Sequence, residues 1–424
     1  MNQVKVHDWT VKPPCVAVLH VDFKGKESLL RSADEKLAEA VNLFEALEVE
    51  VVYSDIVRLS QVNSHTLLGK GKVEVFAGTC RDLKLDAVFV DCDLTPSQQR
   101  NLEKAWQVKV LDRTAVILEI FASRAQTKAG RLQVSLAQIA YQQSRLVRSW
   151  THLERQRGGL SKVGGPGERQ IELDRRMLLD KAKVLREKLA QVKQERGVQR
   201  SARTKQHILQ IALVGYTNAG KSTLFEALTG HEAGSENKLF ATLDPLVRKL
   251  KLLSGREVVL SDTVGFISDL PHELVEAFKA TLEEVVASDL ILQVHDASSL
   301  ECMAQADDVA AVLKQIGACS IPIIHVVNKV DVIECRDDIT LEGIYCSALT
   351  GEGLEELQQR IEEHFAHVEV VHELEISAAE GKKIAWLHSH GKVVEQSLKE
   401  QTWHLKVQLE SSVWQKYQKL FDVG

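Results

Sequence analysis

The stretch GYTNAGKS is the strongest chemical signal in the sequence. It spans Gly215 to Ser222 and fits the pattern GxxxxGK[ST], between the apolar run ILQIALV and the helix-like STLFEAL. Its glycines let backbone N–H groups turn toward phosphates, Lys221 would neutralise the outer phosphates, and the Ser222 hydroxyl would bind Mg²⁺. A chance glycine turn is the alternative, and the flanking strand and helix disfavour it. We expect phosphate-site contacts from Gly215, Tyr216, Thr217, Asn218, Ala219, Gly220, Lys221 and Ser222.

A second segment indicates which base is bound. NKVD follows the apolar strand IPIIHVV and so lies at the carboxyl end of a strand, where α/β sheets bind ligands. The Asp331 carboxylate can accept from the N1–H and the exocyclic amine of guanine, which adenine does not present in that arrangement, and a buried carboxylate without donors is costly. Asn328 would steady the loop, Lys329 would lie along the base, and the Ala348 N–H would meet guanine O6. The predicted base site comprises Asn328, Lys329, Val330, Asp331, Cys346, Ser347 and Ala348.

Two further segments offer ligands for Mg²⁺ and a contact to the γ-phosphate. DTVGF follows an apolar strand, so Asp262 would hold Mg²⁺ through water and Gly265 would donate its N–H to the γ-phosphate. FATLDP offers Thr242 as the second hydroxyl ligand of Mg²⁺, beside Ser222. We expect Lys221, Thr242 and Gly265 to act in hydrolysis. Nucleotide contacts are also predicted for Phe240, Ala241, Thr242, Leu243, Asp244, Asp262, Thr263, Val264 and Gly265. Four elements in this order predict a GTPase that uses Mg²⁺.

Phe266 stands where Ras-like enzymes carry a glutamine that orients the attacking water. A phenyl ring cannot hold that water, so we expect slow intrinsic hydrolysis and stimulation by a partner. Simple packing of Phe266 under the switch is the other interpretation, and both can hold. Some GTPases without the glutamine carry an asparagine at the position of Asn218 and use it to hold K⁺, so potassium is a second candidate cofactor.

The elements that position these segments divide the chain into four predicted domains. Residues 1–123 alternate short apolar runs with helical patterns, which indicates an α/β domain with a mostly parallel sheet. Residues 124–205 carry two heptad patterns around the glycine-rich GGLSKVGGPGER, which predicts a long antiparallel helical hairpin within a helical region that starts near Arg113. Residues 206–368 form the Ras-like P-loop domain. Residues 369–424 predict a small α+β domain with strands 368–377 and 402–410 and helices 382–399 and 413–421.

Charge is distributed unevenly along the chain. Residues 124–205 hold 20 Lys and Arg against 7 Asp and Glu, a balance of +13; the whole chain is −6, so the remainder is −19. Such asymmetry favours a dedicated surface for a polyanion, and a solvated helical face is the alternative. The seven cysteines fit neither a disulfide framework nor a zinc site, and we expect them to be reduced. No apolar run could span a bilayer and the N-terminus lacks a signal-peptide pattern, which predicts a cytoplasmic protein.

With these elements placed, the chain resembles the HflX family of translation-associated GTPases over most of its length. Strings outside the nucleotide segments carry the resemblance: LLGKGKVEVF at 67–76, DRTAVILEIFASRAQTKAGRLQV at 112–134, GGPGERQIELDRRML at 164–178 and LPHELVEAFKATLEEV at 270–285. Arg169 departs from the polar residue of a GPGETQ-like string. The resemblance implies binding to the large (50S) ribosomal subunit and its rRNA, and GTP-dependent ribosome splitting or rescue of stalled ribosomes under stress.

The basic hairpin agrees with that implication. A hairpin with a glycine-rich basic tip suits a phosphate-lined cavity, and the candidate RNA contacts are Arg155, Arg157, Lys162 and Arg169, with simple solvation as the alternative. The family is also described as using ATP through its N-terminal domain, but GKGKVE at 69–74 has no GK[ST], and a turn leading into a helix is the preferred interpretation.

Three function classes remain open at this point: a ribosome-stimulated GTPase, a nucleotide-driven RNA-remodelling (helicase-like) enzyme, and a GTP switch acting on a protein partner. The short glycine loop favours pairing of the two hairpin helices within one chain, and hence a monomer. Peripheral association with a membrane is a further possibility beside the cytoplasmic location.

Overall fold

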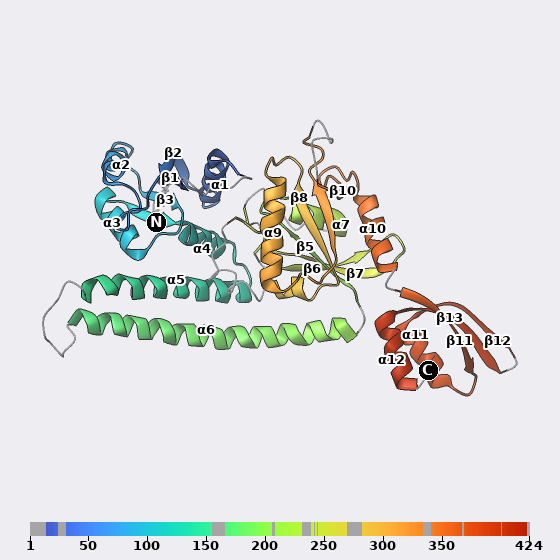
Figure 1. Cartoon of the computed structure of the whole chain (residues 1–424). Helices are drawn as coiled ribbons and strands as arrows, with labels where there is room; N and C mark the ends of the chain where they lie inside the picture. Colours follow the sequence, from blue (N-terminus) through green and yellow to red (C-terminus); the bar gives the residue numbers. More distant parts are fainter. Residues whose placement is uncertain are drawn as a thin grey trace, which may run out of the picture.

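The computed structural model describes most of the chain. The described residues are 14–23, 31–154, 166–205, 208–230, 239–240, 242–243, 245–268, 282–333, 341–366, 369–399 and 401–421. Helices and strands alternate through the first part, two long helices follow, and a second α/β unit and a small α+β unit complete the chain (Figure 1). This arrangement confirms the predicted fold class. Within the described residues, no helix combines the length and apolarity needed to cross a membrane.

The N-terminal unit is a three-layer α/β sandwich. Its parallel sheet has the order β2-β1-β3-β4, and alternate strand residues point to opposite faces. Val16, Val18 and Phe89 pack with α1 and α4 on one face, whereas Leu19 and Val90 pack with α2 and α3 on the other. The elements are β1 (Cys15–Phe23), α1 (Ala33–Glu45), β2 (Glu50–Leu59), α2 (Lys70–Asp82), β3 (Ala87–Asp91), α3 (Pro96–Trp106), β4 (Lys109–Asp112) and α4 (Arg113–Arg124).

The helical region that starts at Arg113 is divided into two helices and does not form a single long one. Helix α4 ends at Arg124 and α5 (Lys128–Glu154) begins after a three-residue break. Ala125 leaves the helical conformation with ψ at 106°. The Thr127 side chain then accepts a hydrogen bond from the Gly130 N–H at 3.1 Å, which caps the new helix.

Helix α6 (Pro166–Lys205) returns alongside α5, and the two lie side by side beneath the N-terminal sheet (Figure 1). The second heptad pattern of the sequence falls on α6, where its apolar residues Leu178, Leu185, Leu189 and Val192 are only partly exposed and Ala182 is buried among them. The remaining described side chains of α6 are mostly exposed, so the helix keeps one apolar stripe toward α5.

The second α/β unit carries the nucleotide motifs. Its sheet has the order β10-β9-β8-β5-β7-β6, and only β6 runs antiparallel to its neighbour. Helix α9 covers one face, while α7 and α10 pack on the other. The elements are β5 (Gln210–Gly215), α7 (Lys221–Thr229), β6 (Leu246–Lys251), β7 (Glu257–Asp262), β8 (Leu290–Asp296), α9 (Cys302–Ile316), β9 (Ile323–Asn328), β10 (Ile344–Tyr345) and α10 (Leu354–Ala366).

One hydrophobic cluster joins the two α/β units. It contains α1 and α4 residues such as Leu43 and Phe121, and residues of the second unit such as Val214, Phe240 and Phe266. All of these side chains are nearly or fully buried. The nucleotide-binding unit therefore packs directly on the N-terminal unit through a shared core.

The C-terminal unit is an antiparallel sheet, β11-β13-β12, with two helices. Its elements are β11 (Glu369–Ser377), α11 (Gly381–His390), β12 (Lys392–Lys399), β13 (Thr402–Glu410) and α12 (Ser411–Phe421). The predicted helix 382–399 was wrong in its second half, which forms β12. The helix ends at Gly391, where a Cβ would lie 2.4 Å from Leu409 Cδ2, so the chain passes close over the sheet and continues as a strand.

Candidate nucleotide site

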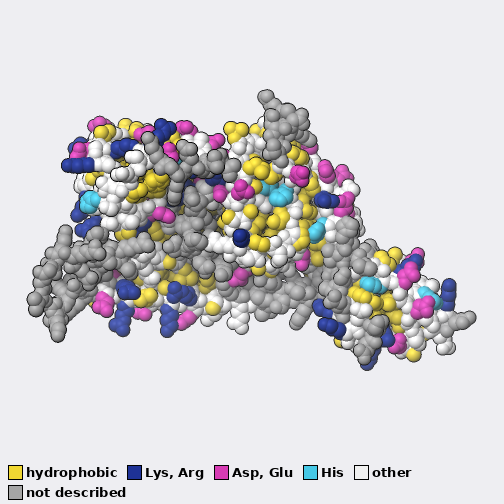
Figure 2. Space-filling model, viewed as in Figure 1, with side chains coloured by type: hydrophobic (Ala, Val, Ile, Leu, Met, Phe, Trp, Pro, Cys, Tyr) yellow, Lys and Arg dark blue, Asp and Glu magenta, His cyan; other side chains and the backbone are white. Residues whose placement is uncertain are grey.

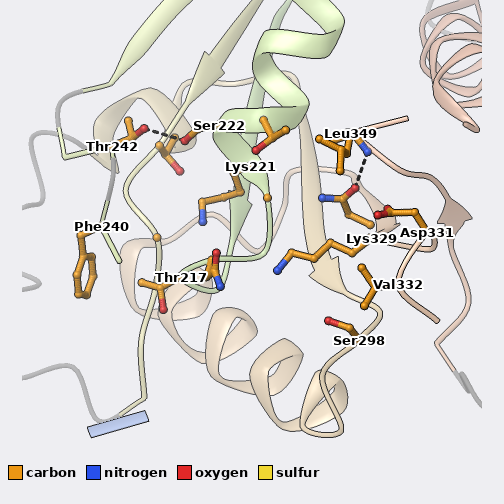
Figure 3. Close-up of a pocket in the computed structure, with 17 residues that line it drawn as sticks. Thr217, Lys221, Ser222, Phe240, Thr242, Ser298, Lys329, Asp331, Val332 and Leu349 are labelled. Carbon is orange, nitrogen blue, oxygen red and sulfur yellow. Dashed lines mark hydrogen bonds between the residues drawn. The ribbon is translucent and has the colours of Figure 1, made fainter. Parts of the chain in front are cut away.

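The P-loop links β5 to the start of α7 in the strand–loop–helix arrangement that its sequence predicts. A cavity of about 510 Å³ opens beside it at the carboxyl end of the parallel strands (Figure 3). Lys221 points into this cavity, and its Nζ donates to the Tyr216 carbonyl oxygen at 2.7 Å. Burial lowers the pKa of Lys221 to about 8, a shift that the nearby Asp262 carboxylate opposes. A buried cation at a helix N-terminus is a suitable partner for phosphate.

Two positions of the P-loop require glycine because neighbouring atoms lie too close for a Cβ. A Cβ on Gly215 would lie 2.3 Å from the Val294 backbone oxygen, and Gly215 also has φ at +155°. A Cβ on Gly220, where φ is +87°, would lie 2.2 Å from Asn328 Nδ2. Because only glycine has no Cβ, these positions let the loop lie against both β8 and the NKVD segment.

Three oxygen-bearing side chains converge where the Mg²⁺ ligands were predicted. Ser222 Oγ and Thr242 Oγ1 lie 2.9 Å apart, and each donates to Asp262 Oδ2 at 2.8 Å. Asp262 is fully buried, and burial raises the pKa of its carboxyl group. Its second oxygen, Oδ1, is buried without a hydrogen-bond partner among the described residues. Hydroxyl and carboxylate oxygens are ligands that Mg²⁺ prefers, and an unpaired buried oxygen suits a metal-bound water, so this set fits the ion.

The DTVGF segment lies directly against the P-loop. The Phe266 N–H donates to the Gly215 oxygen at 3.0 Å, and the Thr217 N–H donates to the Phe266 oxygen at 2.7 Å. A Cβ on Gly265 would lie 3.0 Å from Thr217 Cα and 3.1 Å from Lys221 Nζ, so Gly265 lies beside the P-loop lysine. The Phe266 ring is 1% exposed and packs in the shared core, as the packing interpretation expected.

Asn328 holds the base end of the site together. Its Nδ2 donates to the Ala219 carbonyl oxygen at 2.9 Å, and its Oδ1 accepts from the Ala348 N–H at 2.9 Å. Lys329 has φ at +67°, and its Nζ donates to Asp296 Oδ2 at 2.6 Å. The Ala348 N–H that was predicted to meet guanine O6 is thus paired with Asn328 in this structure.

Asp331 lines the same cavity but is solvent-exposed, whereas the argument for base selectivity assumed a buried carboxylate. Figure 3 shows Asp331 and Lys329 on the side of the cavity that faces Ser298, across from the Ser222 and Thr242 hydroxyls. The carboxylate would be covered only when a base lies over it. Its selectivity therefore depends on the liganded state.

The structure brings thirteen of the predicted nucleotide residues to the cavity wall: Thr217, Asn218, Gly220, Lys221, Ser222, Phe240, Thr242, Thr263, Gly265, Asn328, Lys329, Asp331 and Ala348. The others support that wall from behind: Gly215, Tyr216, Ala219, Leu243, Asp262, Val264, Val330, Cys346 and Ser347. Ala241 and Asp244 lie outside the described residues. Four wall residues were not predicted: Thr223, Ser298, Val332 and Leu349. Ser298 follows β8 at the carboxyl edge of the sheet, a position that could have suggested it.

The predicted RNA contacts cannot be placed against this site. Arg155, Arg157 and Lys162 lie outside the described residues. Arg169 lies in α6, but its side chain is outside the described part of the helix.

Three family models match consecutive parts of the chain. Residues 34–122 match the model described as GTP-binding GTPase N-terminal, and residues 124–203 match the GTP-binding GTPase middle region. Residues 210–329 match the model described as 50S ribosome-binding GTPase. The last of these contains the P-loop, the DTVGF segment and Asn328.

The chain is also similar to whole proteins. It is 45% identical to GTPase HflX of Magnetococcus marinus over 364 residues, which cover 85% of this chain and 84% of that protein. It is 39% identical to GTPase HflX of Escherichia coli over 374 residues, covering 86% of each. A GTP-binding protein from Sulfolobus solfataricus in complex with GDP aligns with 82% of this chain and 97% of its own at 23% identity and a TM-score of 0.43. The sequence relatives and the matched models together show that this chain is a GTPase and belongs to the GTPase HflX family.

Proposed function

We propose that this GTPase binds the large ribosomal subunit and uses GTP binding and hydrolysis to split ribosomes or rescue stalled ones in the cytoplasm. The observation that carries the proposal is an exposed basic helix joined directly to the GTPase unit. Every Lys and Arg side chain that is described on α6 is exposed: Arg175, Arg176, Lys181, Lys183, Arg186 and Lys188. Figure 2 shows Lys and Arg side chains along the edge of the molecule that α6 forms.

The uneven distribution of charge along the chain favours a polyanion as the partner of this helix. The +13 balance of residues 124–205 contrasts with −19 elsewhere. Ribosomal RNA presents dense phosphate, and Lys and Arg that replace its counterions give salt-dependent binding. The family model that matches residues 210–329 is described as a 50S ribosome-binding GTPase, which agrees with this chemistry. The residues flanking the hairpin tip, Arg155, Arg157, Lys162 and Arg169, belong to the same proposed surface.

The nucleotide chemistry of the proposal follows from the cavity. Lys221 and the backbone N–H groups of the loop would hold the phosphates, and Ser222, Thr242 and Asp262 would hold Mg²⁺. Bound Mg²⁺ would neutralise charge on the phosphates. The buried Phe266 supplies no group to orient water, so slow intrinsic hydrolysis and acceleration on the ribosome are expected.

The test is GTP hydrolysis by the purified chain with four additions: none, 50S subunits, 30S subunits, and naked rRNA of equal mass. We expect stimulation by 50S subunits alone. Light scattering of 70S particles with GTP, GDP or a non-hydrolysable analogue then reports splitting. Stimulation by naked rRNA would favour an RNA-remodelling enzyme instead, and no stimulation would favour a switch with a protein partner.

A charge-reversal variant tests the helix itself. The triple variant Lys183→Glu, Arg186→Glu, Lys188→Glu should lower 50S stimulation. It should also reduce the dependence of log affinity on log salt by about 0.9 for each phosphate that the helix no longer neutralises. A matched control reverses Arg81, Lys84 and Arg100, which are exposed on or beside α2 and α3. Equal decreases in both triple variants would argue against a role for α6.

A further inference from the structure

The carboxylate of Glu39 lies at the boundary between the N-terminal unit and the nucleotide-binding unit. It belongs to α1, and its side chain is 16% exposed. The Tyr216 hydroxyl donates to Oε2, and Ser268 Oγ donates to Oε1 at 2.7 Å. The Ser268 N–H in turn donates to the Tyr216 hydroxyl oxygen at 2.8 Å. Glu39, Tyr216 and Ser268 therefore form a closed hydrogen-bonded triangle, which we call the Glu39 clasp.

Arginines on both sides keep the clasp charged and oriented. The Arg113 guanidinium donates to Glu39 Oε1 at 2.5 Å and to Asp91 Oδ1 at 2.6 Å. It also donates to the backbone carbonyl oxygen of Ser268 at 3.0 Å. The Arg31 guanidinium lies 5.4 Å from the Tyr216 ring centroid and pairs with Asp308 of α9 at 2.7 Å. Burial would raise the pKa of Glu39, but Arg113 and the hydrogen bonds lower it overall. Glu39 is thus an anion with fixed partners.

The clasp contacts the two segments predicted to meet the phosphates of the nucleotide. Tyr216 is the second residue of the P-loop, and its backbone oxygen is the acceptor for Lys221 Nζ. Ser268 comes three residues after Gly265, the predicted γ-phosphate donor, in a segment that pairs with the P-loop through Phe266. Fixing Ser268 and Tyr216 to one carboxylate therefore limits how far Gly265 can move from Lys221.

A second contact from the same unit reaches the segment that carries Thr242, a predicted Mg²⁺ ligand. Phe121 of α4 and Phe240 have ring centroids 4.8 Å apart in an edge-to-face arrangement. Phe240 precedes Thr242 by two residues, and Thr242 Oγ1 lies against Ser222 and Asp262 at the proposed Mg²⁺ position. The clasp is closed in a structure in which both hydroxyl ligands have already converged.

We propose that Glu39 is a positioning residue for the GTPase reaction: it holds the P-loop and the DTVGF segment in the arrangement that accepts the γ-phosphate. The inference concerns the nucleotide site and holds whether or not ribosomal subunits stimulate the enzyme. GDP has no γ-phosphate and does not need Gly265 in place. Loss of the clasp should therefore weaken binding of a triphosphate and spare GDP.

The test compares wild type with Glu39→Gln, Ser268→Ala and the double variant. Titration with a fluorescent non-hydrolysable GTP analogue and with fluorescent GDP gives the two dissociation constants. We expect the analogue to bind about 5- to 20-fold more weakly in each single variant, within the usual range of coupling between sites, with GDP affinity unchanged within about twofold. Single-turnover GTP hydrolysis should slow in parallel. Because the two groups share one bond, the double variant should lose little more than either single variant.

Glu45→Gln is the matched control, since Glu45 lies on the same helix and is exposed. It should leave both dissociation constants unchanged. Equal loss of GDP and analogue affinity in Glu39→Gln would overturn the inference and indicate a structural role only. Strictly additive losses in the double variant would overturn it as well. Ser268→Ala removes one hydroxyl from a partly buried position, so it keeps the inference testable if Glu39→Gln fails to fold.

Discussion

Replacing Asn328 with alanine should separate nucleotide affinity from fold stability. Asn328 is 1% exposed and bridges three loops: its amide donates to the Ala219 oxygen, and its oxygen accepts from the Ala348 N–H. Alanine leaves both backbone groups without their partner. Each such loss costs about 1–2 kcal/mol, or about 2–4 kcal/mol for the pair. At 1.4 kcal/mol for each factor of ten, affinity should fall about 30- to 700-fold.

The loss should appear in binding rather than in unfolding. The three loops lie at the carboxyl edge of the sheet, where they can open and hydrate the two backbone groups without disturbing the strands. Nucleotide binding must then close them again. GDP and a GTP analogue should be weakened equally, because Asn328 lies at the base end of the cavity, away from the Mg²⁺ ligands (Figure 3).

Fluorescent-nucleotide titration and calorimetric melting of the same preparations form the assay. Gln359→Ala on α10, an exposed position remote from the three loops, is the control. A drop in melting temperature with unchanged dissociation constants would refute the reasoning, as would a loss of affinity below about threefold.

Four further predictions follow from the site and the core. Gly265→Ala should slow GTP hydrolysis about tenfold or more and weaken a GTP analogue more than GDP, since the added Cβ would crowd Thr217 and Lys221 beside the N–H predicted to meet the γ-phosphate; equal effects on GDP would contradict this. Asp331→Asn should weaken GTP about 10- to 100-fold without improving ATP, as measured by competition. A K⁺ site at Asn218 predicts faster hydrolysis in KCl than in NaCl and loss of that difference in Asn218→Ala; equal rates in the two salts would exclude the site. Burial and the neighbouring His325 lower the pKa of His295 to about 4. As the pH falls, the unfolded chain therefore binds a proton before the folded chain does, and the free energy of unfolding should decrease between pH 6.5 and 4 by at most about 3 kcal/mol. His295→Gln should make the free energy of unfolding less dependent on pH in this range.

Local sequence was sufficient to locate the segments that meet at the cavity and that we predict to hold the phosphates and the metal. The chemistry of each predicted segment lies in a few consecutive residues: GYTNAGKS, DTVGF and the FATLDP segment that contains Thr242. In addition, the carboxyl ends of parallel strands bring such loops to one edge of the sheet. Ser222, Thr242 and Asp262 accordingly meet within hydrogen-bond distance. The end of the helix at Gly391 was missed because KVVEQSLK fits a helical pattern as well as a strand, and only packing against β13 decides between them.

The sequence alone determined the family of this protein and located the segments predicted for its chemistry: a phosphate loop, a metal set, a guanine-reading segment and a basic helical hairpin. Each of these depends on short-range order along the chain. Only the tertiary structure decided which distant residues complete the site. Nothing near Glu39, Arg113 or Phe121 in the sequence indicates a nucleotide, yet the shared core brings them against Ser268, Tyr216 and Phe240. The physical reason is that the hydrophobic effect, which buries α1 and α4 against the nucleotide-binding unit, does not depend on how far apart two residues lie in the sequence. Which residues meet is therefore decided by packing in three dimensions.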